Sequence, residues 1–395
     1  MKTPPLDIRK ARVSAEFKHP SQLFRARFSP CGKVIAAIGV DTAVHLWNIE
    51  DKAKKSFLGH KTWVSSMCFS SAGSDLYTAD YHGVIHCWNY LGGAGSKPRW
   101  TIPAADKDNV RALTIAGNGK FLVSAGDEGV VRVWNTANGK LLKELKGHTE
   151  CVFSLAVHPD GKTLVSGDLL GSIRKWGIPS WKETGELDAR VLHTRKDNFI
   201  ADVGGVRSLS FNPSGKLLAV GGFRDAKSNA FCPGTPAVLV FDWNKGKLKT
   251  ELRVKAKSDG PINGLCFIND STLAGYGEHL HSATELSFWD PAKQAPLHSL
   301  PGHSAYDLDL HPAGRRLLAP VYLSGGTSGN GAQKRHREKY SPNETVLTIY
   351  DLFAEAKKPE PAGLEQAEAA KPATGKPAAQ VPGKKPSVPK IVVKP

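Results

Sequence analysis

Residues 148–176 read HTECVFSLAVHPDGKTLVSGDLLGSIRKW, and this stretch is one copy of a pattern that recurs along the chain. Residues 19–47 and 60–88 also begin with histidine and end with tryptophan, and the two residues are 28 positions apart in all three copies. A constant spacing between the same residue types indicates a repeated structural unit. The histidine, serine and aspartate of the quoted stretch must therefore be interpreted as members of a repeat.

Two further markers recur with the first. One is an apolar strand that runs into a turn with glycine at a fixed place, and its copies are FSPCGK (28–33), FSSAGS (69–74), IAGNGK (115–120), VHPDGK (157–162), FNPSGK (211–216) and LHPAGR (310–315), with a weaker copy, FINDST (267–272), that lacks the glycine. Glycine suits a hairpin turn because it enters positive φ at little cost. The other marker is a β-branched strand that ends in an aromatic residue, at Trp47, Trp88, Trp134, Trp176, Phe241, Trp289 and Tyr350. The markers predict seven units of three short strands, each followed by a fourth strand such as KLLKELKGH (140–148).

Composition limits the class of protein. With 395 residues and 40% hydrophobic content the chain can bury a large core. Its six cysteines are scattered without a C-x-x-C pair, which favours reduced thiols and a cytoplasmic location. The N-terminal MKTPPLDIRK lacks the apolar run of a signal peptide, and no later segment approaches a membrane span, so we expect no membrane partner. The formal net charge of +16 favours acidic partners.

The combined markers resemble those of the WD-repeat (WD40) β-propeller family. Gly-His precedes the first strand of a repeat, and Trp-Asp or Trp-Asn closes the third, as at Trp47-Asn48 and Trp289-Asp290. The resemblance covers about residues 10 to 352. It implies an all-β fold, a single seven-bladed β-propeller of four-stranded antiparallel blades that stack on one another around a ring.

The ring needs a strand that the seventh repeat does not supply. No strand follows Tyr350-Asp351 before a tail rich in Pro, Ala and Lys, whereas KARVSAEFKH (10–19) lies unused before the first repeat. We therefore expect the N-terminal strand to close the ring. The expected organisation is an N-terminal extension over residues 1–9, the propeller over 10–354 and a disordered tail over 355–395.

In the family, the turn histidine, a Ser or Thr of the second strand, an Asp of the next turn and the third-strand Trp are hydrogen-bonded inside each blade. Counted back from the tryptophan, the matching positions are His19, Ala37, Asp41 and Trp47; His60, Thr78, His82 and Trp88; Asp106, Ser124, Glu128 and Trp134; and His148, Ser166, Leu170 and Trp176. On this count no repeat holds a full set, and Asp168 lies two residues from the family's aspartate position. We interpret Ser166 as structural and not as a nucleophile, because a buried strand position offers neither an oxyanion hole nor access to substrate.

Surface features suggest where partners bind. Extra residues at 188–205, 222–236, 275–284 and 320–345 would all lie on one rim of the propeller, as functional loops or as neutral drift. Trp63, Tyr81 and His82 would lie close together at the same face, and a rigid aromatic side chain makes a good interface anchor. Lys334, Arg335, Arg337 and Lys339 form a basic run that either contacts an acidic partner or is simply solvated.

These features favour a non-enzymatic scaffold that binds one or more proteins. The alternatives are a propeller that contacts nucleic acid weakly through residues 334–339 and the lysine-rich tail, and an enzyme whose site is hidden in the inserted loops. We expect a monomer without cofactor or metal, since Glu278, His279 and His281 are too few and too local for a typical zinc site.

Overall fold

The computed structural model describes residues 5–93, 97–228, 234–254, 259–277, 284–322 and 344–353. The chain divides into one unit over residues 1–354 and another over 355–395, and every described residue belongs to the first. Within this described part the helices are two three-residue 3-10 turns, Ile8–Lys10 (η1) and Arg190–Leu192 (η2). No helix there is both long and apolar enough to pass through a bilayer.

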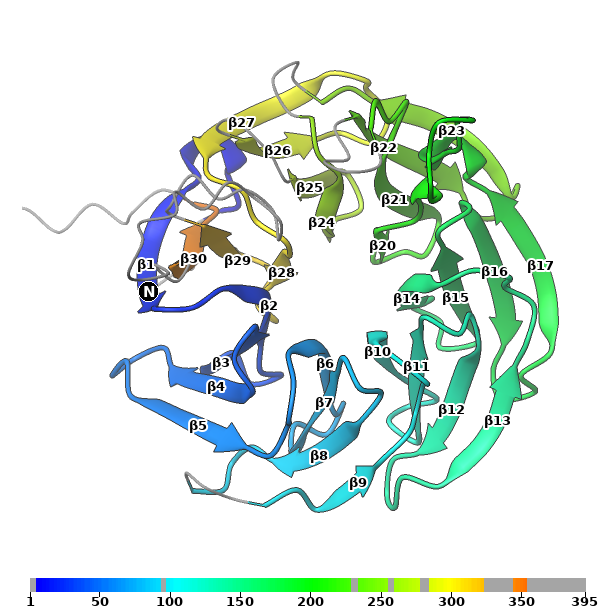
Figure 1. Ribbon diagram of the computed structural model, residues 1–395. Coiled ribbons are helices and arrows are strands. Elements are labelled where there is room, and N and C mark those ends of the chain that lie inside the picture. Colours follow the sequence, from blue (N-terminus) through cyan, green and yellow to red (C-terminus); the bar gives the residue numbers. More distant parts are fainter. Residues whose placement is uncertain are drawn as a thin grey trace, which may run out of the picture. The chain divides into compact units, whose positions relative to one another are not determined.

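The described unit is built from seven four-stranded antiparallel sheets, which we number as blades in chain order (Figure 1). Blades 1 to 3 contain β2 (Leu23–Phe28), β3 (Val34–Gly39), β4 (Ala43–Asn48) and β5 (Lys54–Leu58); β6 (Val64–Phe69), β7 (Asp75–Asp80), β8 (Ile85–Asn89) and β9 (Trp100–Ile102); and β10 (Val110–Ala116), β11 (Phe121–Gly126), β12 (Val131–Asn135) and β13 (Leu141–Leu145). Blades 4 and 5 contain β14 (Val152–Val157), β15 (Thr163–Asp168), β16 (Ser172–Gly177) and β17 (Glu183–Asp188); and β20 (Ser208–Phe211), β21 (Leu217–Arg224), β22 (Thr235–Asp242) and β23 (Lys247–Leu252). Blades 6 and 7 contain β24 (Ile262–Asn269), β25 (Thr272–Gly277), β26 (Thr284–Trp289) and β27 (Pro296–Gly302); and β28 (Asp309–Leu310), β29 (Arg316–Tyr322), β30 (Thr345–Asp351) and β1 (Arg12–His19).

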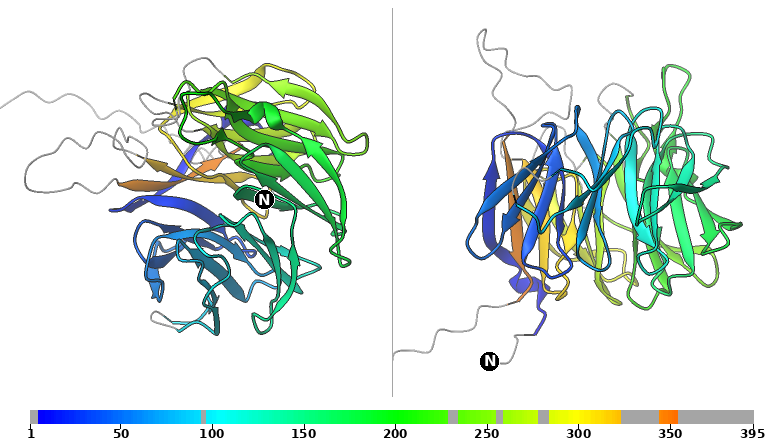
Figure 2. Two further views of the ribbon diagram at one scale, coloured as in Figure 1. Left: turned by 45° about the vertical axis from the view of Figure 1, so that its right-hand side comes forward. Right: turned by 90° about the horizontal axis from the view of Figure 1, so that it is seen from below.

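The ring is closed by the N-terminal strand. Strand β1 is the outer strand of blade 7, where it pairs antiparallel with β30 and places Phe17 opposite Leu347. The inner strands contact one another in a complete circle, from β2 through β6, β10, β14, β20, β24 and β28 back to β2. Figure 1 shows β1 lying beside β30 at the edge of the ring, and the edge-on view in Figure 2 shows strands running from one face of the ring to the other. The predicted seven-bladed propeller and its closure are confirmed.

The hydrophobic core lies between neighbouring blades. One cluster joins Val44 and Phe57 of blade 1 to Met67 and Trp88 of blade 2, and all four side chains are buried. The Phe57 and Trp88 rings are stacked with their centroids 5.5 Å apart. A fully buried large apolar side chain contributes about 1.5–3 kcal/mol, so the ring is stabilised mainly by these contacts between blades. A single blade could not bury both its faces alone.

The hairpin glycines adopt the predicted conformation. In the six markers that contain glycine, φ lies between +69° at Gly314 and +89° at Gly119. A side chain is strained in this left-handed region, which explains why the repeat keeps glycine at this position.

Two of the four predicted insertions are described well enough to compare. Residues 188–205 contain η2 and a small hairpin of β18 (His193–Thr194) and β19 (Val203–Gly204). This segment packs against residues of the 222–236 insertion through the cluster of Phe199, Val203, Phe223 and Ala226. The two insertions therefore form one elaborated edge of blade 5. Residues 278–283 and 323–343 of the other two insertions lie outside the described residues.

Candidate functional site

A buried chain of hydrogen bonds runs through blade 4. The Trp176 indole N–H donates to Ser166 Oγ at 2.8 Å, and Ser166 Oγ lies 2.7 Å from His148 Nε2. His148 Nδ1 lies 2.7 Å from Asp168 Oδ2. Because an indole can only donate and an ionised carboxylate can only accept, the hydroxyl donates to Nε2 and Nδ1–H donates to the carboxylate. The chain satisfies four polar groups in the blade interior.

Blade 2 repeats this arrangement. Trp88 donates to Thr78 Oγ1 at 2.7 Å, Thr78 bonds His60 Nε2 at 2.7 Å, and His60 Nδ1 lies 2.8 Å from Asp80 Oδ2. Burial disfavours ionisation of Asp80, but its hydrogen bonds from His60 and the backbone outweigh this effect and lower its pKa. The carboxylate therefore remains charged and holds the imidazole in one tautomer.

The expectation that no repeat holds a full set was wrong. It placed the acidic position at His82 and Leu170, whereas the carboxylates that bond the histidines are Asp80 and Asp168, two residues earlier. The count from the tryptophan was therefore two residues too late, in the turn beyond the end of the second strand, where Asp80 and Asp168 stand. His82 is exposed in the turn, and its backbone N–H donates to Asp80 Oδ1.

Blades 1 and 3 hold different sets. In blade 3, Trp134 donates to Ser124 Oγ at 2.8 Å, but Asp106 stands where blades 1, 2 and 4 have histidine, and Glu128 pairs with Arg132. Blade 1 has Ala37 at the position where blades 2, 3 and 4 have a serine or threonine hydroxyl. There His19 Nε2 lies 2.9 Å from Asp41 Oδ2.

The order serine, histidine, aspartate in blade 4 is that of a nucleophilic triad, but its burial excludes this chemistry. Ser166 is fully buried, and His148 and Asp168 are 8% and 2% exposed. A nucleophile must reach its substrate, and the hydroxyl here already accepts a hydrogen bond from Trp176. The set holds the blade together and has no access to a substrate.

The more accessible candidate surface is set by a β-bulge in the inner strands. The inner strands of five blades skip one residue in their pairing, and the skipped residues are Phe24, Ser65, Arg111, Phe153 and Asn263. Arg207, just before β20, and Tyr306, just before β28, hold the corresponding places in blades 5 and 7. A bulge re-aims one side chain while the rest of the strand stays paired. We call these seven residues the crown.

The ring has a central cavity that part of the crown reaches. This cavity has a volume of about 540 Å³ including the solvent at its mouth, and residues of all seven inner strands or the residues just before them line it. Among them are Phe153, Arg207 and Asn263 of the crown. A concave site at the centre of a rigid ring is a suitable place for a ligand or a peptide.

One half of the crown region is aromatic. The Phe24 ring centroid lies 6.0 Å from Tyr306 and 6.2 Å from Trp63, and Trp63 lies 5.5 Å from Tyr81. Trp63 is 46% exposed and Tyr81 is 37% exposed. The structure therefore brings together Trp63 and Tyr81, which the sequence analysis singled out, and adds two crown residues to them. We call these four residues the aromatic arc.

The other half of the crown is basic. The Arg207 guanidinium lies 3.9 Å from the centroid of the Phe153 ring, and the Arg111 guanidinium lies 5.0 Å from it. Arg111 also pairs with Asp127, and this pairing outweighs burial and raises the pKa of Arg111. We call Arg111, Phe153 and Arg207 the basic arc. The Phe153 ring thus makes cation–π contacts with two guanidinium groups, one of which is paired with a carboxylate.

Arg25 fixes the backbone where the two arcs meet. Its Nε donates to the Ser65 carbonyl at 2.9 Å and its Nη2 to the Arg111 carbonyl at 3.0 Å. Both carbonyls belong to crown residues, so the guanidinium holds two bulges in place. Burial lowers the pKa of Arg25, against the nearby charge of Asp307, which raises it.

Sequence reasoning missed most of the crown, although a signal for it exists. Six of the seven crown residues lie eight positions before the hairpin glycine of their repeat, as Phe24 does before Gly32 and Tyr306 before Gly314, and Asn263 lies eight positions before Ser271, which replaces that glycine. The basic run of Lys334, Arg335, Arg337 and Lys339, and the cluster of Glu278, His279 and His281, lie outside the described residues.

Comparison with known proteins agrees with this architecture. The family profile "WD domain, G-beta repeat" (WD40) matches residues 51–89, 96–135, 139–177 and 194–227. Its first three matches each begin just before the outer strand of one blade and end with the third strand of the next. Each match therefore ends one residue after the tryptophan that closes the sequence repeat.

Three curated relatives illustrate the similarity. Protein ROOT INITIATION DEFECTIVE 3 of Arabidopsis thaliana is 34% identical over 107 residues, 27% of this chain and 23% of the relative. Jouberin of Rattus norvegicus is 24% identical over 274 residues, 64% of this chain and 24% of the relative. Transcription initiation factor TFIID subunit 5 of Caenorhabditis elegans is 22% identical over 283 residues, 69% of this chain and 41% of the relative. The aligned part thus spans well under half the length of each of these relatives.

The relatives differ in what their names describe, so the shared feature is the repeat and not one activity. Seven closed blades, buried Trp-Ser/Thr-His-Asp chains in blades 2 and 4 and the matching repeat profile all coincide in this chain. The chain belongs to the WD40-repeat family.

Proposed function

We propose that this propeller is a protein-interaction scaffold and that the crown, with Trp63 and Tyr81, is its binding surface. WD40 propellers typically serve as scaffolds for protein partners and are generally not catalysts. The observation that carries the proposal is the joining of exposed aromatic rings to a basic arc around a concave centre. Aromatic and arginine side chains are the residues in which binding energy concentrates at interfaces.

The two arcs define the partner's chemistry. The aromatic arc lies on blades 7, 1 and 2, and the basic arc lies on blades 3 to 5. A peptide that crosses the mouth would bury an apolar side chain against Phe24 and Trp63 and place carboxylates near Arg111 and Arg207. The net charge of +16 adds long-range attraction for such an acidic segment. We therefore propose an extended segment with an apolar anchor beside Asp or Glu.

The test is selection from a random peptide display library on the immobilised full chain. We expect enriched peptides to combine an apolar or aromatic residue with acidic residues, and to bind at least tenfold more weakly to Trp63→Ala and to Arg207→Gln. Leu142→Ala is the matched control, because Leu142 on β13 is 47% exposed, almost as Trp63 is, but lies on an outer strand. Selected peptides that bind all variants equally would contradict the proposed surface.

Binding of nucleic acid is the alternative result, and the same immobilised chain can be used to test for it. If single- or double-stranded oligonucleotides bind the chain with a steep salt dependence while no acidic peptide is selected, the scaffold proposal fails. A cytoplasmic location and a monomeric state stay predictions. All five described cysteines are free thiols, and this pattern supports a reducing environment.

A further inference from the structure

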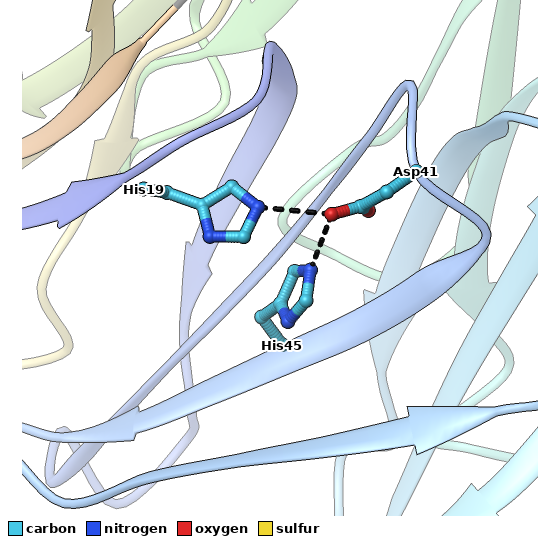
Figure 3. A group of neighbouring side chains, drawn as sticks. All are labelled: His19, Asp41 and His45. Atoms are coloured by element: carbon cyan, nitrogen blue, oxygen red, sulfur yellow. Dashed lines mark hydrogen bonds and ion pairs between the residues drawn. The ribbon is translucent and has the colours of Figure 1, made fainter. Parts of the chain in front are cut away.

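Three side chains of blade 1 converge on one point (Figure 3). His19 Nε2 lies 2.9 Å from Asp41 Oδ2, and His45 Nε2 lies 2.8 Å from the same oxygen. The three ligand-type atoms all lie within 4.8 Å of one another. His19 and His45 are buried, while the Asp41 side chain is 31% exposed, so the cluster lies near the surface on the side of Asp41.

Blade 1 is built for this convergence because its repeat lacks the usual hydroxyl. In blades 2 and 4, Nε2 of the turn histidine is used by Thr78 or Ser166. Ala37 stands at that position in blade 1, and the Nε2 atom of His19 instead faces Asp41. The His45 ring lies beside it, with centroids 4.3 Å apart. A nitrogen that bonds a buried hydroxyl in blades 2 and 4 is thus directed here at a carboxylate whose side chain is partly exposed.

A fourth oxygen lies at the same point. Ser21 Oγ is 2.9 Å from His19 Nε2 and 3.0 Å from Asp41 Oδ2. Ligand atoms of a tetrahedral zinc site lie about 3.3–3.5 Å apart, given metal–ligand distances near 2.0–2.1 Å. The separations of 2.8 to 3.0 Å would need to widen by only about half an ångström to admit an ion. Two imidazoles, a carboxylate and an oxygen donor or water make up a usual zinc set.

The carboxylate of Asp41 also has an oxygen to spare for an ion, and carboxylate oxygens are common zinc ligands. Asp41 Oδ1 is buried without a hydrogen-bond partner among the described residues, which leaves one acceptor unsatisfied.

We propose that His19, Asp41 and His45 form a binding site for a divalent transition-metal ion, and that Zn²⁺ fits this ligand set best. The proposal is independent of the crown. The ion would join His19, at the end of the closing strand β1, to Asp41 and His45 of blade 1. Because β1 belongs to blade 7, the ion would fasten blade 7 to blade 1 where the ring closes.

The groups beside Nδ1 of the two imidazoles determine whether each ring can bind an ion through Nε2. Binding through Nε2 requires each ring to carry its proton on Nδ1. His45 Nδ1 lies 2.8 Å from Ser56 Oγ, which can accept that proton. His19 Nδ1 lies 3.0 Å from the Lys54 ammonium, which cannot accept it. Lys54 is exposed and must turn away when the ion binds, so it acts as a competitor for the site.

The first test measures Zn²⁺ and Co²⁺ binding to the metal-stripped full chain by equilibrium dialysis with elemental analysis, and the melting temperature with and without ion. We expect one ion per chain and a higher melting temperature, because a ligand that binds only the native state stabilises it. His45→Gln should weaken binding by at least about 100-fold, as expected for loss of a ligand. Mg²⁺ should have no effect, since it prefers oxygen ligands.

Two matched variants separate this site from others. His86→Gln alters the corresponding histidine of blade 2, which bonds Thr101 and no carboxylate, and should leave Zn²⁺ affinity unchanged. Lys54→Gln supplies an acceptor for His19 Nδ1–H and should tighten binding about tenfold. Cys31, an exposed thiol, is replaced by serine in all samples so that it does not bind the ion itself.

Absence of stoichiometric Zn²⁺ binding would overturn the proposal, as would equal affinity in wild type and His45→Gln. If His45→Gln does not fold, as judged by circular dichroism, Lys54→Gln decides the matter. A Lys54→Gln protein that binds Zn²⁺ no more tightly than wild type would show that His19 is not a ligand.

Discussion

The buried hydroxyls of blades 3 and 4 allow one prediction in which the protein provides its own control. Ser166→Ala and Ser124→Ala are the same substitution at the same position of the second strand, and both side chains are fully buried or nearly so. Ser166 has two hydrogen-bond partners, Trp176 and His148, whereas Ser124 has one described partner, Trp134. The two variants differ mainly in how many buried groups lose a partner.

The magnitudes follow from this difference. A buried polar group left without a partner costs about 1–3 kcal/mol, while loss of the hydroxyl volume costs little. Ser124→Ala leaves only the Trp134 indole N–H unpaired and should lower the free energy of unfolding by about 1–2 kcal/mol. Ser166→Ala leaves both the Trp176 N–H and His148 Nε2 unpaired and should cost about 2–4 kcal/mol.

The assay is urea unfolding at pH 7, followed by far-UV circular dichroism. The comparison requires equal m values, because an altered slope would signal a changed unfolded state or populated intermediates. Equal losses for the two serines, or a larger loss for Ser124→Ala, would refute the reasoning that the chain from indole to carboxylate stabilises the blade.

Three further predictions concern closure, pH and turn geometry. Phe17→Ala on the closing strand should lower the free energy of unfolding by about 3–5 kcal/mol, because this ring is 4% exposed; Val13→Ala on the same strand, 48% exposed, should cost under about 0.5 kcal/mol in the same urea titration. Burial, only partly offset by Arg27, raises the pKa of Asp309 to about 6. The native carboxyl thus holds its proton more tightly than the unfolded one, and its contribution to stability falls as pH rises from about 4 to 6. Asp309→Asn should remove this loss, so that the variant gains about 2–3 kcal/mol on wild type between pH 4 and 7 in unfolding titrations; a constant difference would contradict the assignment. Gly83→Ala should destabilise more than Gly314→Ala, since both glycines have φ near +70° but a methyl at Gly83 would lie 2.0 Å from a backbone oxygen, whereas nothing lies within 4 Å at Gly314; differential scanning calorimetry measures the difference, and equal shifts in melting temperature would count against it.

The sequence alone determined the repeat, the number of blades and the closing strand. The repeat and the number of blades follow from local signals, namely glycine at the turns and short β-branched strands. The closing strand follows from a count of strands, because the seventh repeat has three and residues 10–19 supply the fourth. Such signals survive divergence because every repeat must satisfy the same steric and pairing rules. The contact between Trp63 and Tyr81 was predicted for the same reason, from the parity of strands in a blade.

Only the tertiary structure decided which side chains meet across the strands and between blades. The count along the sequence placed the histidine's acidic partner at position 170, which is leucine, and only the structure shows that Asp168 bonds His148. The crown depends on a bulge in five of the inner strands and on closure of the ring, which brings Tyr306 beside Phe24 although they are far apart in the chain. The family resemblance had already placed His19 and Asp41 in one set, but only the structure shows that His45 and Ser21 converge on the same carboxylate oxygen. Turns and repeats can be predicted from sequence because they depend on short-range steric rules. The side chains that meet on a surface depend instead on which distant residues the closed ring brings together.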